Sequence, residues 1–338
     1  MSFTVVASFA SPAHAAAIAP LDAAGCTIRQ IPAEVRVWTP ELVAEYAPIA
    51  DAWLGTFPGL KLPRAVLERS ERARLVVSSI IGTDFIDVTA ASDLGILVAH
   101  GAMPENFEGM AEAGVMLIAA LRKSLPVKQA TLAGGRWKPV EAGHMVKGAI
   151  IGIIGFGRIG QGIARRLQGW DCSVITHDPY LSVEVAAGAG AELVPLEDLL
   201  ERSDVVLTLT TLSDETRHMI DEAAIARMKP GAYLINIGRG GCVDEAALLA
   251  ALDEGRLAGA AIDTWESEPV ATDHPLLRHP RVIATGHVIG HSEELYGRIP
   301  EVAAENVLRG LRGQEPLYVR NPEAIPAWRD RLARLAAA

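Results

Sequence analysis

Residues 149–160 read AIIGIIGFGRIG, an apolar run followed at once by three closely spaced glycines. The apolar part, Ala149–Ile154, predicts a buried strand, because strands covered on both faces are almost continuously hydrophobic. After it, Gly155 permits a tight turn, Gly157 lets the backbone approach a pyrophosphate, and Gly160 lets the next helix pack close to the strand. The segment therefore predicts a strand, a turn and a helix that together bind a dinucleotide.

An acidic residue follows the next predicted strand. Ser173–His177 has the pattern of that strand, and Asp178 comes directly after it. A carboxylate at this position accepts hydrogen bonds from the ribose hydroxyls of NAD. The N-terminus of the intervening helix offers free N–H groups to the phosphates. We therefore expect the cofactor to be NAD.

Composition limits the class of protein. The chain has 338 residues, 50% of them hydrophobic, and a formal net charge of −10. Its length suggests two domains, and its acidity argues against a nucleic-acid partner. No apolar run is long enough to span a membrane. The cysteines Cys26, Cys172 and Cys242 form neither a metal motif nor a disulfide framework, so we expect no metal site and a cytoplasmic location.

Beyond the glycine segment, strands and helices alternate regularly. Such alternation with short loops predicts a doubly wound parallel sheet, whose ligands bind beyond the carboxyl ends of the strands. The predicted strands are Val205–Leu209, Ala232–Ile237, Gly259–Asp263 and Val282–Ala284, with helices at Asp221–Met228 and Asp244–Glu254. Further predicted helices are Pro104–Arg122 and Glu293–Arg312. The first half of the chain shows the same α/β pattern.

Charged side chains stand at several of these strand ends. Arg239 lies among glycines after one strand, where a guanidinium can bind a carboxylate through two hydrogen bonds. Asp263 ends another strand, and Glu268 follows in the same loop, where an acid can hold an imidazole. His287 follows the last strand, where it can act as a general acid or base beside a cofactor. His291 is a competing candidate. Taken singly, Arg239 could be a surface arginine that closes a turn, the acids in the loop after Asp263 are more typical of solvated charges, and a lone histidine is usually structural.

These segments resemble the D-isomer-specific 2-hydroxyacid dehydrogenase family over nearly the whole chain. The matching segments occur in the order of the family and near its spacing: Ile81–Asp87, Val146–Gly148 with the glycine segment, Asp214–Arg217, Met228–Ala232, Arg239–Asp244 and Asp263–Pro269. The resemblance implies hydride transfer between NAD(H) and a 2-hydroxy acid/2-keto acid pair. It implies a Rossmann cofactor domain at residues 109–290. This domain is inserted in a smaller flavodoxin-like α/β substrate domain built from residues 1–108 and 291–338.

The resemblance also assigns expected roles. Arg239, Glu268 and His287 would be catalytic, with Arg239 holding the substrate. Ile81, Gly82 and Asn106 would also contact the substrate. The expected cofactor contacts are Gly155, Gly157, Arg158, Ile159, Gly160, Asp178, Thr210, Ile237, Gly238, Asp263 and Gly290. Members of the family are usually homodimers, with the interface around Leu121–Trp137, so a homodimer is expected.

Three departures from the family pattern bear on activity. Leu209–Thr211 replaces a His-x-Pro turn, so that cofactor contact must differ, and Gly286 replaces the proline that commonly precedes the histidine. The basic cluster of phosphoglycerate-specific members has no match in Trp53–Phe57. We therefore expect an unphosphorylated substrate such as glyoxylate, hydroxypyruvate or a larger keto acid. Trp53, Phe57 and Lys61 fall near the family's substrate loops, although core packing explains the two aromatic residues equally well.

Related activities remain alternatives. Formate dehydrogenases carry glutamine at the position of Glu268, and phosphite dehydrogenases carry lysine at the position of Ile81, so both are disfavoured. A phosphoglycerate dehydrogenase-like enzyme and an NAD-sensing binding protein of the corepressor kind stay open, as does a structural protein that binds no ligand.

We predict that the unmodified protein prefers NADH to NADPH. The Asp178 carboxylate repels a 2′-phosphate, and no arginine follows it closely to offset that repulsion. Measuring kcat/KM with both cofactors on one accepted keto acid tests this preference. Equal efficiencies would contradict the assignment of Asp178.

Overall fold

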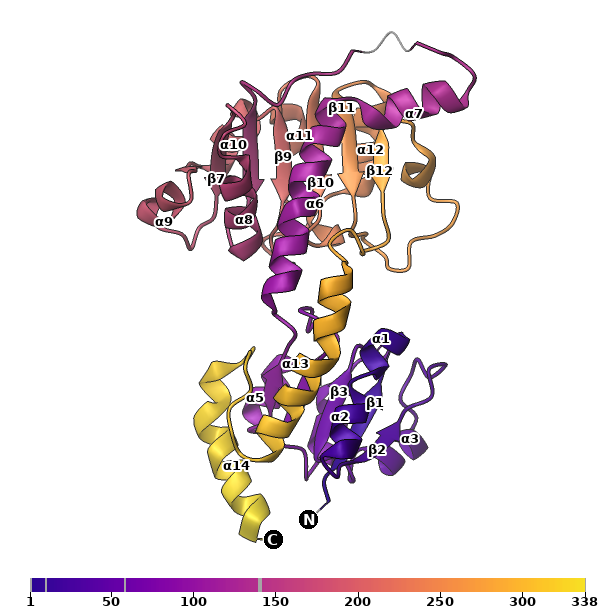
Figure 1. Cartoon of the computed structure of the whole chain (residues 1–338), viewed down its shortest axis with the longest axis vertical. Helices are drawn as coiled ribbons and strands as arrows, with labels where there is room; N and C mark the ends of the chain where they lie inside the picture. Colours follow the sequence, from indigo (N-terminus) through magenta and orange to yellow (C-terminus); the bar gives the residue numbers. More distant parts are fainter. Residues whose placement is uncertain (1, 10, 58, 139–141, 338) are drawn as a thin grey trace. The chain divides into compact units, whose positions relative to one another are not determined.

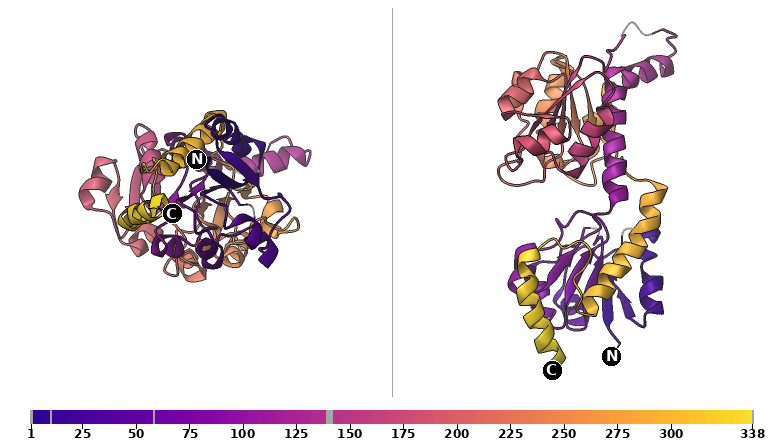
Figure 2. Two further views of the ribbon diagram at one scale, coloured as in Figure 1. Left: turned by 90° about the horizontal axis from the view of Figure 1, so that it is seen from below. Right: turned by 60° about the vertical axis from the view of Figure 1, so that its left-hand side comes forward.

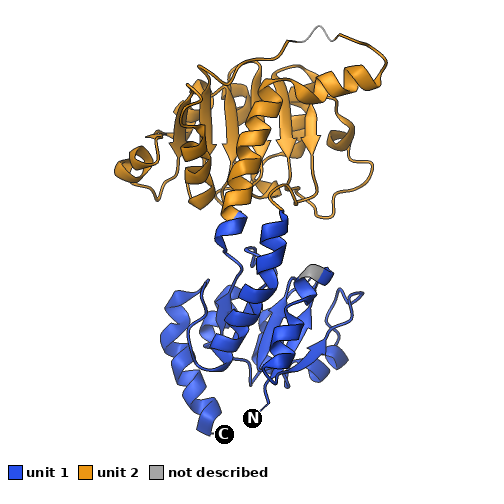
Figure 3. Ribbon diagram, in the orientation of Figure 1, with its two compact units in different colours: residues 1–106, 292–338 blue, residues 107–291 orange. Residues whose placement is uncertain are grey.

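The computed structural model describes residues 2–9, 11–57, 59–138 and 142–337. The chain divides into two compact units (Figure 3): unit 1 comprises residues 1–106 and 292–338, and unit 2 comprises residues 107–291. These bounds differ by one or two residues from the expected domain limits. Unit 2 is thus an insertion in the sequence of unit 1.

Unit 1 is built on a five-stranded parallel sheet (Figure 1) in the order β2-β1-β3-β4-β5. This order is that of the flavodoxin-like fold. Its strands are β1 Thr4–Ser8, β2 Thr27–Gln30, β3 Ala52–Gly55, β4 Leu75–Ser78 and β5 Leu97–Ala99. Its helices are α1 Pro12–Ala15, α2 Ile18–Ala23, α3 Pro40–Tyr46, α4 Arg64–Arg69, α5 Val88–Asp93, α13 Glu293–Leu311 and α14 Ile325–Ala337, with the 3-10 helix η3 Pro322–Ala324.

Two apolar clusters cover the two faces of this sheet. Trp53 and Phe57 belong to one of them and are 0% and 2% exposed. The Trp53 ring lies edge-on to Trp38 at 5.8 Å, and Phe57 stacks on Phe85 at 5.3 Å. Core packing therefore accounts for Trp53 and Phe57, and neither side chain is available to line a substrate pocket.

Polar side chains attach the C-terminal segment to the sheet of unit 1. The Asn321 amide accepts a bond from the backbone N–H of Val98 at 2.8 Å and donates one to the carbonyl of Ile96 at 3.1 Å. The Arg331 guanidinium, on α14, donates to the backbone carbonyls of four residues: Ser70, Glu71, Ala73 and Leu94. These bonds explain why the two ends of the chain form one unit.

Unit 2 contains a seven-stranded parallel sheet in the order β12-β11-β10-β9-β6-β7-β8. Its strands are β6 Ile150–Ile154, β7 Ser173–His177, β8 Glu192–Leu193, β9 Val205–Thr208, β10 Ala232–Asn236, β11 Leu257–Ile262 and β12 Val282–Ala284. Strand order reverses between β6 and β9, and such a switch point is where doubly wound sheets bind ligands. The predicted Rossmann fold is confirmed.

Helices cover both faces of this sheet (Figure 2). They are α8 Arg158–Leu167, α9 Val183–Gly188, α10 Leu196–Arg202, α11 Glu222–Arg227 and α12 Glu245–Asp253, together with most of α6 Pro104–Arg122. Helix α7 Leu125–Ala133 follows α6 and belongs to neither apolar cluster of this sheet. The 3-10 helices η1 Gly240–Cys242 and η2 Pro275–Arg278 lie in connecting loops. Among the helices that the structure describes, none is long and apolar enough to cross a membrane.

Glycines let α6 lie close to α8. A Cβ atom on Gly114 would stand 2.5 Å from Ile163 Cδ1, and one on Gly162 would stand 2.9 Å from Ala111 Cβ. An ion pair between Arg166 and Glu108 joins the same two helices. The helix that begins at the glycine segment is thereby fixed on one side by the sheet and on the other by α6.

Candidate functional site

The three glycines of the 155–160 segment differ in why a side chain would or would not fit. Gly155 has φ +87°, a conformation that L side chains rarely adopt, and a Cβ there would lie 3.0 Å from the Leu209 carbonyl carbon. A Cβ on Gly160 would lie 2.9 Å from the Gly155 oxygen. A Cβ on Gly157 would meet no protein atom within 4 Å. Packing therefore explains Gly155 and Gly160, whereas the open space at Gly157 fits a pyrophosphate that approaches the backbone.

The start of α8 is suited to phosphate oxygens. Gly157 precedes the helix and no side chain caps its first turn, which contains Arg158 and Ile159. Exposed N–H groups at a helix N-terminus attract anions. The Arg158 guanidinium lies 4.6 Å from the centre of the Phe107 ring, a cation–π contact that holds this side chain beside the glycine turn.

Asp178 shapes the same turn. Its Oδ2 accepts a hydrogen bond from the Phe156 backbone N–H at 2.9 Å, and its Oδ1 accepts one from the Tyr180 N–H at 3.0 Å. Each oxygen of an ionised carboxylate can accept more than one hydrogen bond. The carboxylate therefore keeps the capacity to accept hydrogen bonds from ribose hydroxyls while it holds the turn.

The expected cofactor contacts at Thr210, Ile237 and Gly238 lie together where β9 and β10 end. The Thr210 hydroxyl lies 3.4 Å from Cys242 Sγ, and Ile237 is buried in the core. A Cβ on Gly238 would lie 3.0 Å from the carbonyl oxygens of Thr208 and Thr210. Here the backbone, more than the side chains, is the part that can face a cofactor.

Gly290 has a structural reason of its own. A Cβ there would stand 2.3 Å from Met110 Sδ, and one on Gly109 would stand 2.5 Å from the Gly290 carbonyl oxygen. A side chain at position 290 would therefore displace the Met110 side chain, so packing against α6 favours glycine there.

Buried Asn236 holds the loop that carries Arg239. At the end of β10, its Nδ2 donates to the Arg239 carbonyl at 3.2 Å, and its Oδ1 accepts from the Thr208 hydroxyl at 2.7 Å. Leaving a buried donor without a partner costs about 1–3 kcal/mol, so this arrangement resists displacement. The sequence analysis missed Asn236, although its position at a strand end directly before the Arg239 loop was visible.

The loops of Arg239 and Glu268 touch through their backbones. A Cβ on Gly240 would stand 1.9 Å from the carbonyl carbon and oxygen of Trp265, so only glycine fits. Trp265 in turn donates its backbone N–H to Glu268 Oε1 at 3.0 Å. Arg239 and Glu268 are therefore held on neighbouring, mutually locked segments at the ends of β10 and β11.

Glu268 and His287 form a close pair. His287 Nδ1 lies 2.9 Å from Glu268 Oε2 and 3.1 Å from Oε1. About half of each side chain is exposed. Because Nδ1 faces the carboxylate, the other ring nitrogen, Nε2, is left as the atom that can exchange a proton with a ligand.

The contact between Glu268 and His287 favours the charged form of each side chain. The hydrogen bond to Glu268 holds the pKa of His287 above its ordinary value, although partial burial acts in the opposite direction. Partial burial alone would raise the pKa of Glu268. Hydrogen bonds from His287 and from the Trp265 N–H nevertheless keep that pKa below its ordinary value. The pair therefore favours a carboxylate beside an imidazolium.

Asp263 fixes the loop that carries His287. Its Oδ1 accepts hydrogen bonds from the Thr285 hydroxyl at 2.6 Å and from the N–H groups of Val288 and Ile289 at 2.9 and 3.1 Å. Bonds to charged groups contribute about 1.5–3 kcal/mol each, whereas a glycine costs about 0.5–1 kcal/mol relative to alanine. The three bonds therefore outweigh the conformational freedom that Gly286 gives to the loop.

His291 stands apart from this arrangement. Its backbone N–H donates to the Val288 carbonyl at 2.9 Å, and its side chain is exposed. Partial burial, opposed by Asp263, lowers the pKa of His291. The geometry thus assigns the close contact with Glu268 to His287.

The expected substrate residues Ile81, Gly82 and Asn106 belong to unit 1. Ser78, at the end of β4, donates its hydroxyl to the carbonyls of Ile80 at 2.9 Å and Gly82 at 2.8 Å, and so shapes the loop of Ile81. Asn106 lies in the first turn of α6 and is partly exposed.

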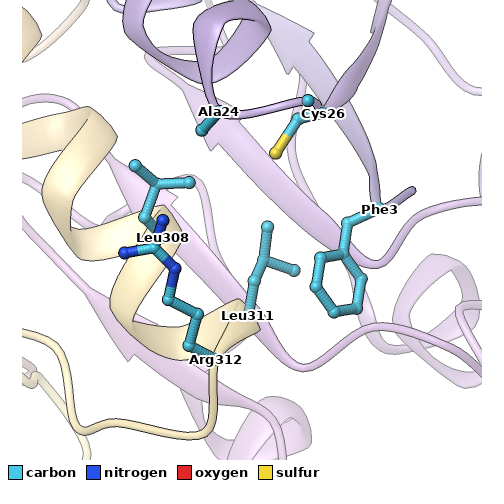
Figure 4. A pocket seen from close by; sticks show the side chains of 7 residues that line it. Phe3, Ala24, Cys26, Leu308, Leu311 and Arg312 are labelled. Atoms are coloured by element: carbon cyan, nitrogen blue, oxygen red, sulfur yellow. The ribbon is translucent and has the colours of Figure 1, made fainter. Parts of the chain in front are cut away.

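A small cavity of about 110 Å³ lies at the opposite, amino edge of the unit 1 sheet (Figure 4). Phe3, Cys26, Leu311 and Arg312 are among its lining residues. Burial raises the pKa of the Cys26 thiol, which leaves it protonated and unreactive. In the described ranges of the chain, no three His, Cys, Asp or Glu side chains are grouped so that they could hold a metal ion.

Comparison with known proteins agrees with this picture. Residues 115–288 match the D-isomer specific 2-hydroxyacid dehydrogenase family in its NAD binding domain. A glyoxylate reductase of Korarchaeum cryptofilum is 37% identical over 267 residues, which are 77% of this chain and 80% of that protein. A D-3-phosphoglycerate dehydrogenase of Methanocaldococcus jannaschii is 36% identical over 82% of this chain, but the chain spans only 52% of that relative.

A solved structure extends the similarity to both units. The glyoxylate reductase of Paecilomyes thermophila has a TM-score of 0.84 with 25% identity, over 96% of this chain and 99% of that chain. The expected fold, family and NAD cofactor are confirmed. The chain belongs to the D-isomer specific 2-hydroxyacid dehydrogenase family, and its residues 115–288 form the NAD-binding domain of that family.

Proposed function

We propose that this chain is an NAD-dependent oxidoreductase that interconverts a 2-hydroxy acid of D configuration and the matching 2-keto acid. The observation that carries the proposal is the Glu268–His287 pair, held through Trp265 and Gly240 beside the loop of Arg239. These groups stand at consecutive strand ends of an NAD-binding domain, where a ligand of that domain reacts.

Each residue of the site has a proposed task. Arg239 binds the substrate carboxylate, for which a planar guanidinium with paired donors is suited. His287 Nε2 gives a proton to the keto oxygen in reduction and takes it from the hydroxyl in oxidation. Glu268 orients the ring and stabilises its protonated form. Bound NAD supplies or accepts the hydride.

The cofactor contacts stay as proposed from the sequence. Gly157, Arg158 and Ile159 would face the pyrophosphate, Asp178 the ribose, and Asp263 the carboxamide. The Asp263 Oδ1 atom is engaged by three protein donors, so the Oδ2 atom is the better candidate for this last contact. Ile81, Gly82 and Asn106 stay proposed substrate contacts.

We propose an unphosphorylated substrate of the glyoxylate or hydroxypyruvate kind, or a larger keto acid. The segment Trp53–Phe57 carries no basic side chain, and its two aromatic rings are buried. A glyoxylate reductase is among the relatives, and the match with this chain spans 80% of its length. The phosphoglycerate dehydrogenases are equally similar in identity, so a phosphorylated substrate is the alternative for the test below.

A homodimer is proposed through the segment that follows α6. Large apolar side chains are exposed there, including Leu132 and Trp137 at 58% and 80%. Apolar groups of this kind mark interaction surfaces. A cytoplasmic location is proposed because none of the three cysteines is paired.

We predict that His287→Gln loses most of the turnover while NADH binding stays near that of the wild type. General acid–base catalysis contributes about 10²–10⁴-fold, and glutamine cannot exchange the proton. His291→Gln is the matched control and should change turnover little. Steady-state rates on a panel of 2-keto acids and NADH fluorescence titration measure both effects.

The ranking of these two variants decides the assignment. A larger loss in His291→Gln would move the proton transfer to His291. Normal NADH binding with no turnover of any keto acid by the wild type would favour the NAD-sensing alternative.

We predict a lower kcat/KM for 3-phosphohydroxypyruvate than for hydroxypyruvate. Without basic side chains in Trp53–Phe57, a phosphate dianion gains no compensating ion pair there. The two specificity constants, measured at one pH and ionic strength, test this preference. A clear preference for the phosphorylated compound would favour the phosphoglycerate dehydrogenase-like alternative.

We predict that Glu268→Gln shifts the pH profiles of both reaction directions to lower pH. The variant removes the charge that raises the His287 pKa, so the imidazole loses its proton at lower pH. Reduction needs protonated His287 and should decline earlier as pH rises, whereas oxidation needs neutral His287 and should extend to lower pH. Profiles of kcat/KM against pH for both directions check the shift. If the pH at which each profile rises or falls is the same in the variant and the wild type, Glu268 does not act on His287.

A further inference from the structure

We propose that Trp265 is a positioning residue that sets the separation of Glu268 and His287, because it is hydrogen-bonded to the loops of both. The inference rests on the proposed function, in which His287 carries the proton. It adds a role for a buried side chain to which the proposed function gives none.

Trp265 makes one bond to each side of the pair. Its backbone N–H donates to Glu268 Oε1 at 3.0 Å. Its indole Nε1–H donates to the Thr285 carbonyl at 2.8 Å, two positions before His287 in the chain. One residue therefore fixes the carboxylate through its backbone and the histidine loop through its side chain.

Trp265 is itself held rigidly. The residue is 4% exposed, and Gly240 lies against its carbonyl group. Its ring meets the His274 ring edge-on at 5.5 Å, and His274 Nε2 lies 3.1 Å from Glu245 Oε2. These contacts prevent the indole from following a displaced Thr285, so the indole bond can act as a fixed support for that loop.

The consequence concerns the charge of His287. Without the indole donor, the loop of His287 keeps its hydrogen bonds to Asp263. It loses the bond from Trp265 to the Thr285 carbonyl, which ties this loop to the segment of Glu268. The imidazole can then move away from Glu268, whose hydrogen bond is the main support of its proton. The other charged groups that act on the pKa of His287 are Asp263, which favours the proton, and Arg239, which disfavours it.

The test compares Trp265→Phe with Trp328→Phe in the whole chain. Trp328 is a matched control: it is 1% exposed, lies on α14 of unit 1, and its Nε1 has no hydrogen-bond partner among the residues that the structure describes. Both variants remove similar ring volume from a core, but only Trp265→Phe removes a hydrogen bond. Thermal unfolding reports the packing loss, which is expected in both.

The deciding readout is the pKa of His287, followed by NMR of the imidazole signals and assigned by their loss in His287→Gln. In Trp265→Phe this pKa should fall toward the unperturbed value of about 6.5, and in Trp328→Phe it should stay at the wild-type value. With an accepted keto acid, Trp265→Phe should also lower kcat by about two- to tenfold, the effect of one neutral hydrogen bond.

An unchanged His287 pKa in folded Trp265→Phe overturns the proposal, as does an equal fall in both variants. If Trp265→Phe does not fold, benzothienylalanine at position 265 keeps the fused rings and removes only the N–H. The same replacement at position 328 is its control. An unchanged His287 pKa, or an equal fall in both variants, again overturns the proposal. Because the pKa is measured without substrate, a wild type that turns over no keto acid contradicts the proposed function and leaves this comparison readable.

Discussion

Gly240 lies so close to the carbonyl group of Trp265 that no side chain fits between the two backbones. The geometry of the candidate site depends on this contact, since it joins two loops that leave different strands. The loop after β10 carries Arg239, and the segment after β11 carries Glu268. A side chain at position 240 would move the loop of Arg239 away from the segment of Glu268.

The same principle of close backbone approach recurs at the cofactor end of unit 2. Gly160 lets α8 begin against Gly155, and Gly114 and Gly162 let α6 and α8 lie close to each other. Gly157 is different, because no protein atom would meet its Cβ. We propose that a bound anion explains this glycine, because packing does not require it and it stands at the start of an uncapped helix. The structure thus separates glycines that packing requires from one that it does not.

Two carboxylates then determine how the His287 loop and its imidazole are held. Asp263 holds the His287 loop with its carboxylate, and Glu268 meets the imidazole with another. The two acids come from one short segment but have different tasks. Asp263 is almost fully buried and satisfied by donors of the protein, whereas Glu268 is partly exposed and paired with a group that titrates. This division explains how a histidine loop that contains Gly286 keeps a defined geometry.

The sequence by itself determined the doubly wound sheet, the dinucleotide segment and the strand ends that carry Arg239, Glu268 and His287. These features follow from local patterns: apolar runs, glycine spacing and the order of charged residues along the chain. Local patterns could not show that Trp53 and Phe57 are core residues, that Asn236 holds the Arg239 loop, or that Trp265 joins Glu268 to the loop of His287. Those relations depend on side chains far apart in the chain, and only the tertiary structure brings their donors and acceptors within hydrogen-bonding distance.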